Sequence, residues 1–215
     1  MIIHICGASW SGKSYLGKQI ENKLKKYNIL VTDMDILWES FLKIKNFPKN
    51  PKQIKIKYQE HIDNFIKQNK KYEYLFFVGL NAFLPGDKHW FEDNTLINLP
   101  SNYFNLQSDI NLYIDIDTNT IIKQQYDRGY KMYIANFCNY MNNNKDNIYN
   151  KLLKNENKAK KELTDTFNIT ILEPLDFSSI KKETTTWNTY YKNIGYTFMT
   201  QKQILEKCIN LVKMT

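Results

Sequence analysis

Arginine, cysteine and histidine are scarce in this chain, and each shortage narrows the class of protein it encodes. Arg128 is the only arginine among 30 basic residues. Proteins that read nucleic acids use arginine forks for phosphates and guanines, so this scarcity weakens a nucleic-acid role and leaves it a secondary candidate. The net charge of +8 favours anionic partners such as nucleotides and leaves nucleic acid open. The abundance of lysine, asparagine and isoleucine is typical of an AT-rich genome.

The three cysteines and three histidines are spread along the chain. An odd number of cysteines without a C-x-x-C pair argues against a disulfide framework and against a cysteine zinc site. No apolar run reaches the roughly 18 residues of a membrane span. The first residues already follow a strand pattern, which leaves no room for a signal peptide. We therefore expect a soluble cytoplasmic protein without a membrane partner.

The pattern of apolar residues predicts strands and helices that alternate along the chain. Strands are predicted over residues 2–6, 29–35, 72–80, 110–117 and 169–174. Helices are predicted over residues 13–27, 36–44, 53–70, 118–129 and about 200–213, with a loop at 81–94 and a mostly helical insertion at 130–168. This alternation predicts a single α/β domain over 1–215, with a mostly parallel five-stranded sheet that helices cover on both faces.

The sequence GASWSGKS at residues 7–14 matches the phosphate-loop pattern G-x-x-x-x-G-K-[ST]. It follows a predicted strand and opens a predicted helix, so backbone N–H groups and the positive end of the helix dipole converge on one anion. Lys13 can reach the β- and γ-phosphates of a nucleotide, and the Ser14 hydroxyl can bind Mg²⁺. The predicted nucleotide-binding residues are Gly7, Ala8, Ser9, Trp10, Ser11, Gly12, Lys13, Ser14 and Tyr15, with the Trp10 side chain directed away from the phosphates.

Two carboxylates, Asp33 and Asp35, end the second predicted strand. Because they are two residues apart on a strand, we expect their side chains to leave on the same side. One carboxylate can hold Mg²⁺ through water, and the other can accept a proton from an attacking hydroxyl or bind a polar substrate. The alternative is that both are turn or cap residues for the following helix.

Through GASWSGKS, TDMDI and the segment around Arg128, the chain resembles small P-loop kinases of the shikimate, gluconate and nucleoside/nucleotide kinase group. The resemblance implies the three-layer P-loop NTPase fold with a helical lid insertion. It also implies that Asp33 is linked to Mg²⁺ and that Asp35 is the substrate binder or base.

The run YIDIDTNTIIKQQYDRGY adds a resemblance to thymidylate and deoxynucleoside kinases. In these a strand ending in Tyr-Leu-Asp is followed by a helix and by R-x-x-x-R-G, which leads into a mobile lid. Here Tyr113 to Asp115 correspond to the strand end, Gln124 to the first arginine, and Arg128 to the second. The resemblance implies a lid over about 127–165 in which Arg128 closes on the transferring phosphate, where an arginine fork stabilises negative charge. The alternative is a surface arginine paired with a nearby acid.

Three weaker features complete the picture. Asn81 follows the third predicted strand, where many P-loop enzymes place an acid, so its neutrality argues against a hydrolytic ATPase and moves metal binding to Asp33. Trp38 is a candidate for stacking on a substrate, with burial in the core as the alternative. The apolar segment 130–141 packs either in the core or in a homodimer interface.

Together these features predict an ATP- and Mg²⁺-dependent phosphotransferase whose acceptor is a small molecule, with a nucleoside or nucleotide favoured. The region 36–72 is predicted to bind the acceptor. The predicted roles are catalysis for Lys13, Asp35 and Arg128, metal binding for Ser14 and Asp33, and substrate contact for Asp35, Trp38 and Asn81. Two alternatives stay open: a kinase that acts on a polynucleotide 5′-hydroxyl, and a nucleotide-binding protein without transfer activity.

Overall fold

A computed structural model describes most of the N-terminal half of the chain and its C-terminal part. The described residues are 1–45, 47–48, 50–83, 88–90, 96–98, 104, 106–121, 123–124 and 177–214, with the backbone alone at 88–90, 96–98 and 177–180. The chain divides into two compact units, one formed by Met1–Asp115 with Trp187–Thr215 and the other by Ile116–Thr186. Outside the described residues lie Arg128, the predicted lid at 127–165, the apolar segment 130–141 and the predicted strand at 169–174.

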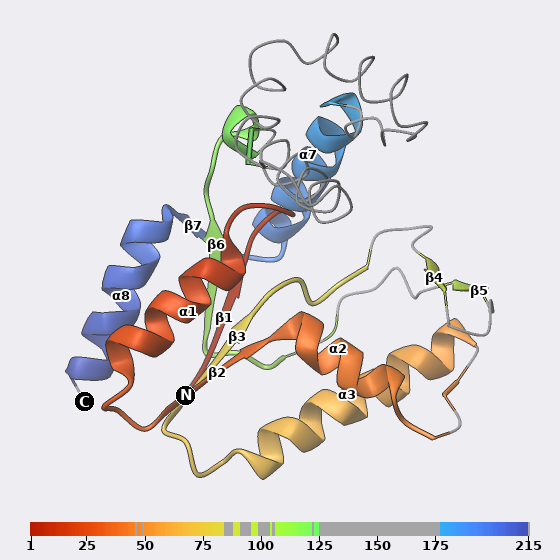
Figure 1. Cartoon of the computed structure of the whole chain (residues 1–215), viewed down its shortest axis with the longest axis horizontal. Coiled ribbons are helices and arrows are strands. Elements are labelled where there is room, and N and C mark those ends of the chain that lie inside the picture. Colours follow the sequence, from red (N-terminus) through yellow and green to blue (C-terminus); the bar gives the residue numbers. More distant parts are fainter. Residues whose placement is uncertain are drawn as a thin grey trace, which may run out of the picture. The chain divides into compact units, whose positions relative to one another are not determined.

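A five-stranded sheet forms the centre of the first unit, and all of its strand pairs are parallel (Figure 1). Its strands are β1 (Ile2–Cys6), β2 (Ile29–Asp33), β3 (Tyr74–Val78), β6 (Ile110–Ile114) and β7 (Thr197–Met199). Their spatial order is β2-β3-β1-β6-β7, so β1 is central. The predicted α/β fold with a parallel five-stranded sheet is therefore confirmed. Because the carboxyl ends of parallel strands share one edge, the segments after β1 and β2 meet there.

Strand β3 is apolar without alternation because helices cover both faces of the sheet. All five of its residues are buried. A side chain at Gly17 of α1 (Lys13–Leu24) would touch Val78 and Val31, so α1 packs on that face. Leu75 and Phe77 point to the opposite face, where they join the cluster formed by α2 (Met34–Leu42) and α3 (Pro51–Gln68).

The helices on each face follow from apolar stripes that the sequence already contains. Helix α8 (Gln201–Lys213) packs beside α1 (Figure 1). On the other face, Ile54, Tyr58 and Ile62 of α3 are buried, as their spacing predicts. Helix α3 begins with Asn50 as N-cap and Pro51 at its first turn, which explains why it starts there. Among the residues described, no helix is long and apolar enough to cross a membrane.

The fifth strand of the sheet was not predicted at its actual position. Strand β7 (Thr197–Met199) has only three residues and one of them is exposed, so it carries no apolar pattern. Its place in the sheet comes from pairing with β6. The predicted loop at 81–94 is also wrong in part, because β4 (Lys88–Trp90) pairs antiparallel with β5 (Leu96–Asn98).

Helix α7 (Phe177–Asn193) was not predicted either. Its centre is rich in threonine, which has low intrinsic helix propensity. Thr185 and Thr186 each donate a hydroxyl hydrogen bond of 2.8 Å to the carbonyl four residues earlier, so both hydroxyls have partners within the helix. Further along, Trp187 and Tyr191 are buried in an aromatic cluster with Tyr113, so tertiary packing holds this part of the helix.

Candidate active site

The loop between β1 and α1 has the backbone of an anion cradle. The amide of Ser11 donates a hydrogen bond of 3.1 Å to the carbonyl of Ala8, which closes a turn. Trp10 and Gly12 both have positive φ, at 67° and 83°. Gly12 is the N-cap of α1, which has neither a side-chain cap nor an acidic residue in its first turn. The positive end of the helix dipole therefore stays available to an anion.

Gly7 is required by the close packing of the loop on itself. A Cβ atom at Gly7 would lie 2.5 Å from Ser11 Oγ and 3.1 Å from Ile114 Cβ. Ser11 is fully buried, and its hydroxyl has no hydrogen-bond partner within the described part of the chain. The loop is therefore a tight cradle that a side chain at Gly7 would fill.

Lys13 lies across the loop. Its Nζ donates hydrogen bonds to the carbonyls of Gly7, at 2.9 Å, and Ala8, at 2.8 Å. Its charge also acts on Asp35: burial and the charge of Asp33 raise the pKa of that carboxyl group, and the charge of Lys13 opposes the rise. The ammonium group is therefore at the same edge of the sheet as the carboxylates that follow β2.

Ser14 and Asp33 are brought into direct contact. Ser14 Oγ, in the first turn of α1, donates a hydrogen bond of 2.9 Å to Asp33 Oδ2 at the end of β2. Asp33 Oδ1 accepts a bond of 3.0 Å from the amide of Asp35, so Asp33 is also the N-cap of α2. A hydroxyl and a carboxylate are hard oxygen donors, and Mg²⁺ usually uses one or two such groups together with substrate phosphates. The pair fits Mg²⁺, and the metal-binding role remains a prediction.

Asp35 is not on a strand, which corrects the predicted geometry of the two aspartates. Strand β2 ends at Asp33, and Asp35 lies in the first turn of α2. Its side chain is exposed to solvent. Even so, partial burial of the carboxyl group and the charge of Asp33 raise the pKa of Asp35, against the opposing effect of Lys13. A carboxylate with a raised pKa beside a phosphate loop is suited to accept a proton.

Three aromatic rings, those of Trp38, Tyr58 and Phe83, form an aromatic wall near Asp35. Trp38 is half-buried one turn further along, on the same helix face as Asp35. Its ring centroid lies 5.0 Å from that of Tyr58 and 4.9 Å from that of Phe83. Burial, and to a smaller extent the charge of Asp35, raise the pKa of Tyr58 above its usual range. Asp35 and the aromatic wall are therefore neighbours.

The Asn81 amide is already engaged by the protein. Its Nδ2 donates a hydrogen bond of 3.0 Å to the carbonyl of Phe104, and its Oδ1 accepts one of 2.9 Å from Tyr191 Oη. The side chain is 1% exposed. Contact with a substrate remains a prediction for Asn81, but these bonds tie it to its own chain. Tyr191 is the residue that sequence reasoning missed here, because α7 itself was missed.

The two side chains of β1 that can change charge, His4 and Cys6, are both neutral at neutral pH. His4 bonds to the carbonyl of Gly79 at 2.8 Å and to the hydroxyl of Tyr196 at 2.5 Å, and burial lowers the pKa of His4 to about 4. It is a core residue whose two ring nitrogens both have hydrogen-bond partners. Burial raises the pKa of the Cys6 thiol to about 12, so it stays protonated at neutral pH.

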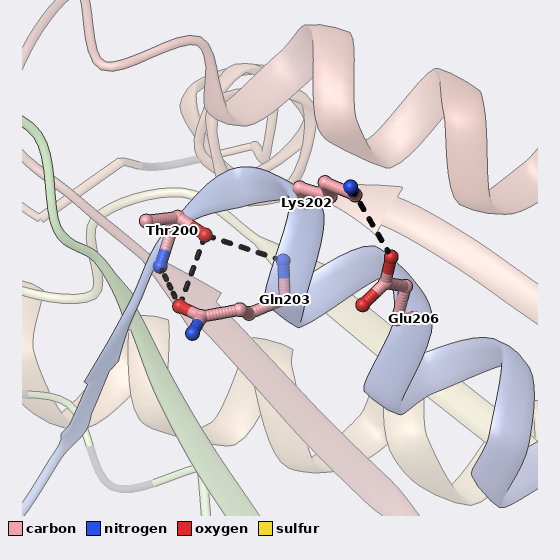
Figure 2. A network of polar contacts seen from close by, with 4 residues as sticks. All are labelled: Thr200, Lys202, Gln203 and Glu206. Carbon is pink, nitrogen blue, oxygen red and sulfur yellow. Dashed lines mark hydrogen bonds and ion pairs between the residues drawn. The ribbon is translucent and has the colours of Figure 1, made fainter.

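Gln201, at the start of α8, contacts the phosphate loop although no sequence motif marks it. Its Nε2 donates a hydrogen bond of 2.6 Å to the carbonyl of Ser11. Thr200 is the N-cap of α8 and forms a capping box with Gln203 (Figure 2). Only the folded chain brings residues 11 and 201 together.

Comparison with known proteins gives matches among solved structures alone. No protein-family model matches the sequence, and no curated protein gives a significant match. Among solved structures, a deoxyadenosine kinase from M. mycoides with bound dATP matches with 12% sequence identity and a TM-score of 0.32. The match covers 99% of this chain and 97% of that one. Similarity at this level says nothing about substrate, so the function has to follow from the loop and the carboxylates.

Proposed function

We propose that this chain is an ATP- and Mg²⁺-dependent phosphotransferase whose acceptor is a nucleoside or a nucleotide. The observation that carries the proposal is the 2.9 Å hydrogen bond between Ser14 Oγ and Asp33 Oδ2, with Lys13 and Asp35 close enough to act on one another's charge. One edge of the sheet thereby holds a phosphate loop, a lysine, a hydroxyl–carboxylate pair and a second carboxylate. Phosphoryl transfer by positioning and electrostatic stabilisation uses groups of this kind.

In the proposed complex the loop amides and Lys13 bind the β- and γ-phosphates of ATP. Lys13 exchanges its bonds to Gly7 and Ala8 for bonds to phosphate oxygens. Ser14 Oγ and Asp33 hold the metal. When bound, Mg²⁺ neutralises the negative charge that develops between the β- and γ-phosphates.

Asp35 is the proposed base. It accepts the proton of the acceptor hydroxyl, whose oxygen forms a bond to the γ-phosphorus while the bond to the bridging oxygen breaks and ADP leaves. The raised pKa of Asp35 makes this carboxylate a better proton acceptor than an ordinary aspartate. The hydrogen bond from the Asp35 amide to Asp33 fixes the start of α2 and so the distance between the two carboxylates.

The half-buried indole of Trp38 supports a nucleoside or nucleotide as the acceptor. An acceptor hydroxyl at Asp35 brings the rest of the molecule against Trp38 and the Tyr58 ring beneath it. A flat base stacks on such a wall, and base–aromatic stacking is sequence-tolerant and favourable. The region 36–72 contains both α2 and α3, and it is the proposed acceptor-binding region.

Arg128 and the lid over about 127–165 belong to the proposal as well. Arg128 is the only arginine in the sequence, and the other 29 basic residues are lysines. Its guanidinium group is the one best suited to bind the γ-phosphate in a bidentate manner. Lid closure would also exclude water and so limit ATP hydrolysis.

The net charge of +8 favours a second candidate, a kinase for a polynucleotide 5′-hydroxyl. Binding of a polynucleotide neutralises several phosphates, so its affinity falls steeply with salt. A nucleoside acceptor without phosphates lacks that dependence. Affinity for an oligonucleotide measured from 50 to 200 mM salt therefore separates the two candidates, provided that transfer to its 5′-hydroxyl is measured in parallel.

The experiment that tests the proposal is ATP consumption with Mg²⁺ in the presence of nucleosides, nucleotides, sugars or a 5′-hydroxyl oligonucleotide, with the phosphorylated product identified by mass spectrometry. At least one nucleoside or nucleotide is expected to stimulate turnover, and EDTA to abolish it. Lys13→Ala serves as the inactive control. ATP binding without stimulation by any acceptor would instead favour a nucleotide-binding protein without transfer activity.

A further inference from the structure

A side-chain hydrogen bond joins Gln201, the first residue of α8, to the phosphate loop. Its Nε2 lies 2.6 Å from the carbonyl oxygen of Ser11, 190 residues away in sequence. Ser11 immediately precedes Gly12, the N-cap of α1. The bond therefore joins the start of one helix to the start of another, through the last peptide of the loop.

This peptide has a defined orientation because the bond holds one of its ends. In a trans peptide the C=O and the following N–H point in opposite directions, and the described residues contain no cis peptide bond. The Gln201 amide draws the Ser11 carbonyl toward α8. The N–H of Gly12 consequently points away from α8.

Gly12 provides the space that this contact needs. A Cβ atom at Gly12 would lie 2.3 Å from Gln201 Nε2, far inside contact distance. Its φ of 83° is also a conformation that glycine adopts without strain. The glycine of the motif therefore has a second task here, which is to leave room for a side chain from the C-terminal helix.

The backbone that carries Gln201 is fixed on both sides. The Thr200 hydroxyl accepts a hydrogen bond of 3.3 Å from the Gln203 amide, and Gln203 Oε1 accepts one of 2.9 Å from the Thr200 amide (Figure 2). Before it, the carbonyl of Met199 in β7 accepts a bond of 2.9 Å from the amide of Asp115. A donor on a rigid support can hold a loop in one conformation, whereas a donor on a mobile segment cannot.

We infer that Gln201 is a positioning residue of the phosphate loop, which fixes the Ser11–Gly12 peptide so that the Gly12 N–H faces the bound phosphate. We call the hydrogen bond from Gln201 to the Ser11 carbonyl the clamp. The clamp is present without a nucleotide, but its effect on phosphate binding rests on the proposed nucleotide-binding function. Gln201 does not touch the reacting atoms. It lowers the cost of binding by keeping the loop in its binding conformation before the ligand arrives.

The test compares Gln201→Met, which keeps the side-chain length and removes the donor, with Lys202→Met, its exposed neighbour. Without nucleotide, ¹⁵N relaxation is expected to show that the Gly12 order parameter falls from about 0.85 to below about 0.6 in Gln201→Met alone. Affinity for the Mg²⁺ complex of a non-hydrolysable ATP analogue should fall by roughly 3- to 10-fold, the value of one hydrogen bond. Both variants should melt within a few degrees of the wild type.

A second variant, Gln201→Glu, guards against a chance repacking of methionine. It places a carboxylate against the Ser11 carbonyl and should loosen Gly12 at least as much. An unchanged order parameter in both Gln201 variants would overturn the clamp. A looser Gly12 with unchanged affinity for the analogue would overturn its role in phosphate binding. If the wild type binds no nucleotide while Gly12 still loosens, the clamp is supported and the proposed nucleotide site is the part that fails.

Discussion

The hydroxyl of Ser14 donates a hydrogen bond of 2.9 Å to Asp33 Oδ2, which joins the first turn of α1 to the last residue of β2. This contact links the two motifs that are most informative in the sequence, the phosphate loop and the pair of aspartates. It also gives Asp33 two tasks, since its other oxygen caps α2. The two tasks can be separated by substitution.

Asp33→Asn should keep the helix cap and lose the charge that a metal needs. Asparagine is as good an N-cap as aspartate, so the free energy of unfolding should change by less than about 0.5 kcal/mol. The Mg²⁺ concentration for half-maximal turnover should rise at least about tenfold, because a neutral amide binds Mg²⁺ poorly. Asp33→Ala should add a loss of about 1 kcal/mol of stability. Urea denaturation and a Mg²⁺ titration of turnover measure the two effects; equal Mg²⁺ dependence in Asp33→Asn and wild type would remove Asp33 from the metal site.

Asp35→Asn should abolish phosphoryl transfer while the Mg²⁺ complex of the ATP analogue still binds. Because the pKa of Asp35 is raised in the folded protein, the rate should decline on the acid side at a higher pH than it would with an aspartate of ordinary pKa. The sign for stability is opposite to that of a salt-bridged acid. In the window between the unfolded and the raised folded pKa, the folded state binds more protons, so stability falls as pH rises through it.

The same argument makes Asp35→Asn slightly more stable than the wild type at pH 7, where the unfavourable carboxylate is present. Denaturation at pH 7 and at pH 3, below both pKa values, tests this. The gain should be seen at pH 7 and should vanish at pH 3. A variant that is active, or that is destabilised equally at both pH values, would argue against a base at this position.

Gly12→Ala should be more damaging than Gly195→Ala, although both glycines have similar φ, at 83° and 85°. A Cβ atom at Gly195 meets nothing within 4 Å, so this control should lose only the roughly 1–2 kcal/mol of a left-handed alanine. At Gly12 the added Cβ atom would also push away the flexible end of the Gln201 side chain and break its hydrogen bond to the Ser11 carbonyl. We expect a larger loss of stability, together with loss of nucleotide-analogue binding that Gly195→Ala does not show. Thermal unfolding and titration calorimetry measure both, and equal losses in the two variants would contradict the packing argument.

Trp38→Leu should raise KM for the nucleoside or nucleotide acceptor by about tenfold and leave KM for ATP within about twofold, since stacking on a base is worth about 1–3 kcal/mol. Phe41→Leu is the matched control, because Phe41 belongs to the same cluster but is 1% exposed. That variant should lose about 1 kcal/mol of stability or more without a change in acceptor KM. If both variants shift acceptor KM equally, Trp38 acts only through the core.

The described helices and strands separate what a local pattern can predict from what it cannot. Helix α3 was predicted because its apolar residues recur with the helical period, and strand β3 because its residues form a short continuous apolar run. Strand β7 and helix α7 were missed because each depends on distant partners, β7 on pairing with β6 and the end of α7 on the aromatic cluster around Tyr191. A pattern within one segment contains no record of such partners.

The candidate site divides in the same way. The sequence by itself determined the phosphate loop, its lysine and hydroxyl, and the two aspartates, because these residues act through short spacings along the chain. Only the tertiary structure decided that Asp35 lies on a helix, that the Asn81 amide is used by Tyr191, and that Gln201 holds the Ser11 carbonyl. The physical reason is that strand ends and side-chain hydrogen bonds are fixed by the competition among all neighbours of a group. Ser11 and Gln201 are 190 positions apart in the sequence, and they come into contact only when the sheet assembles.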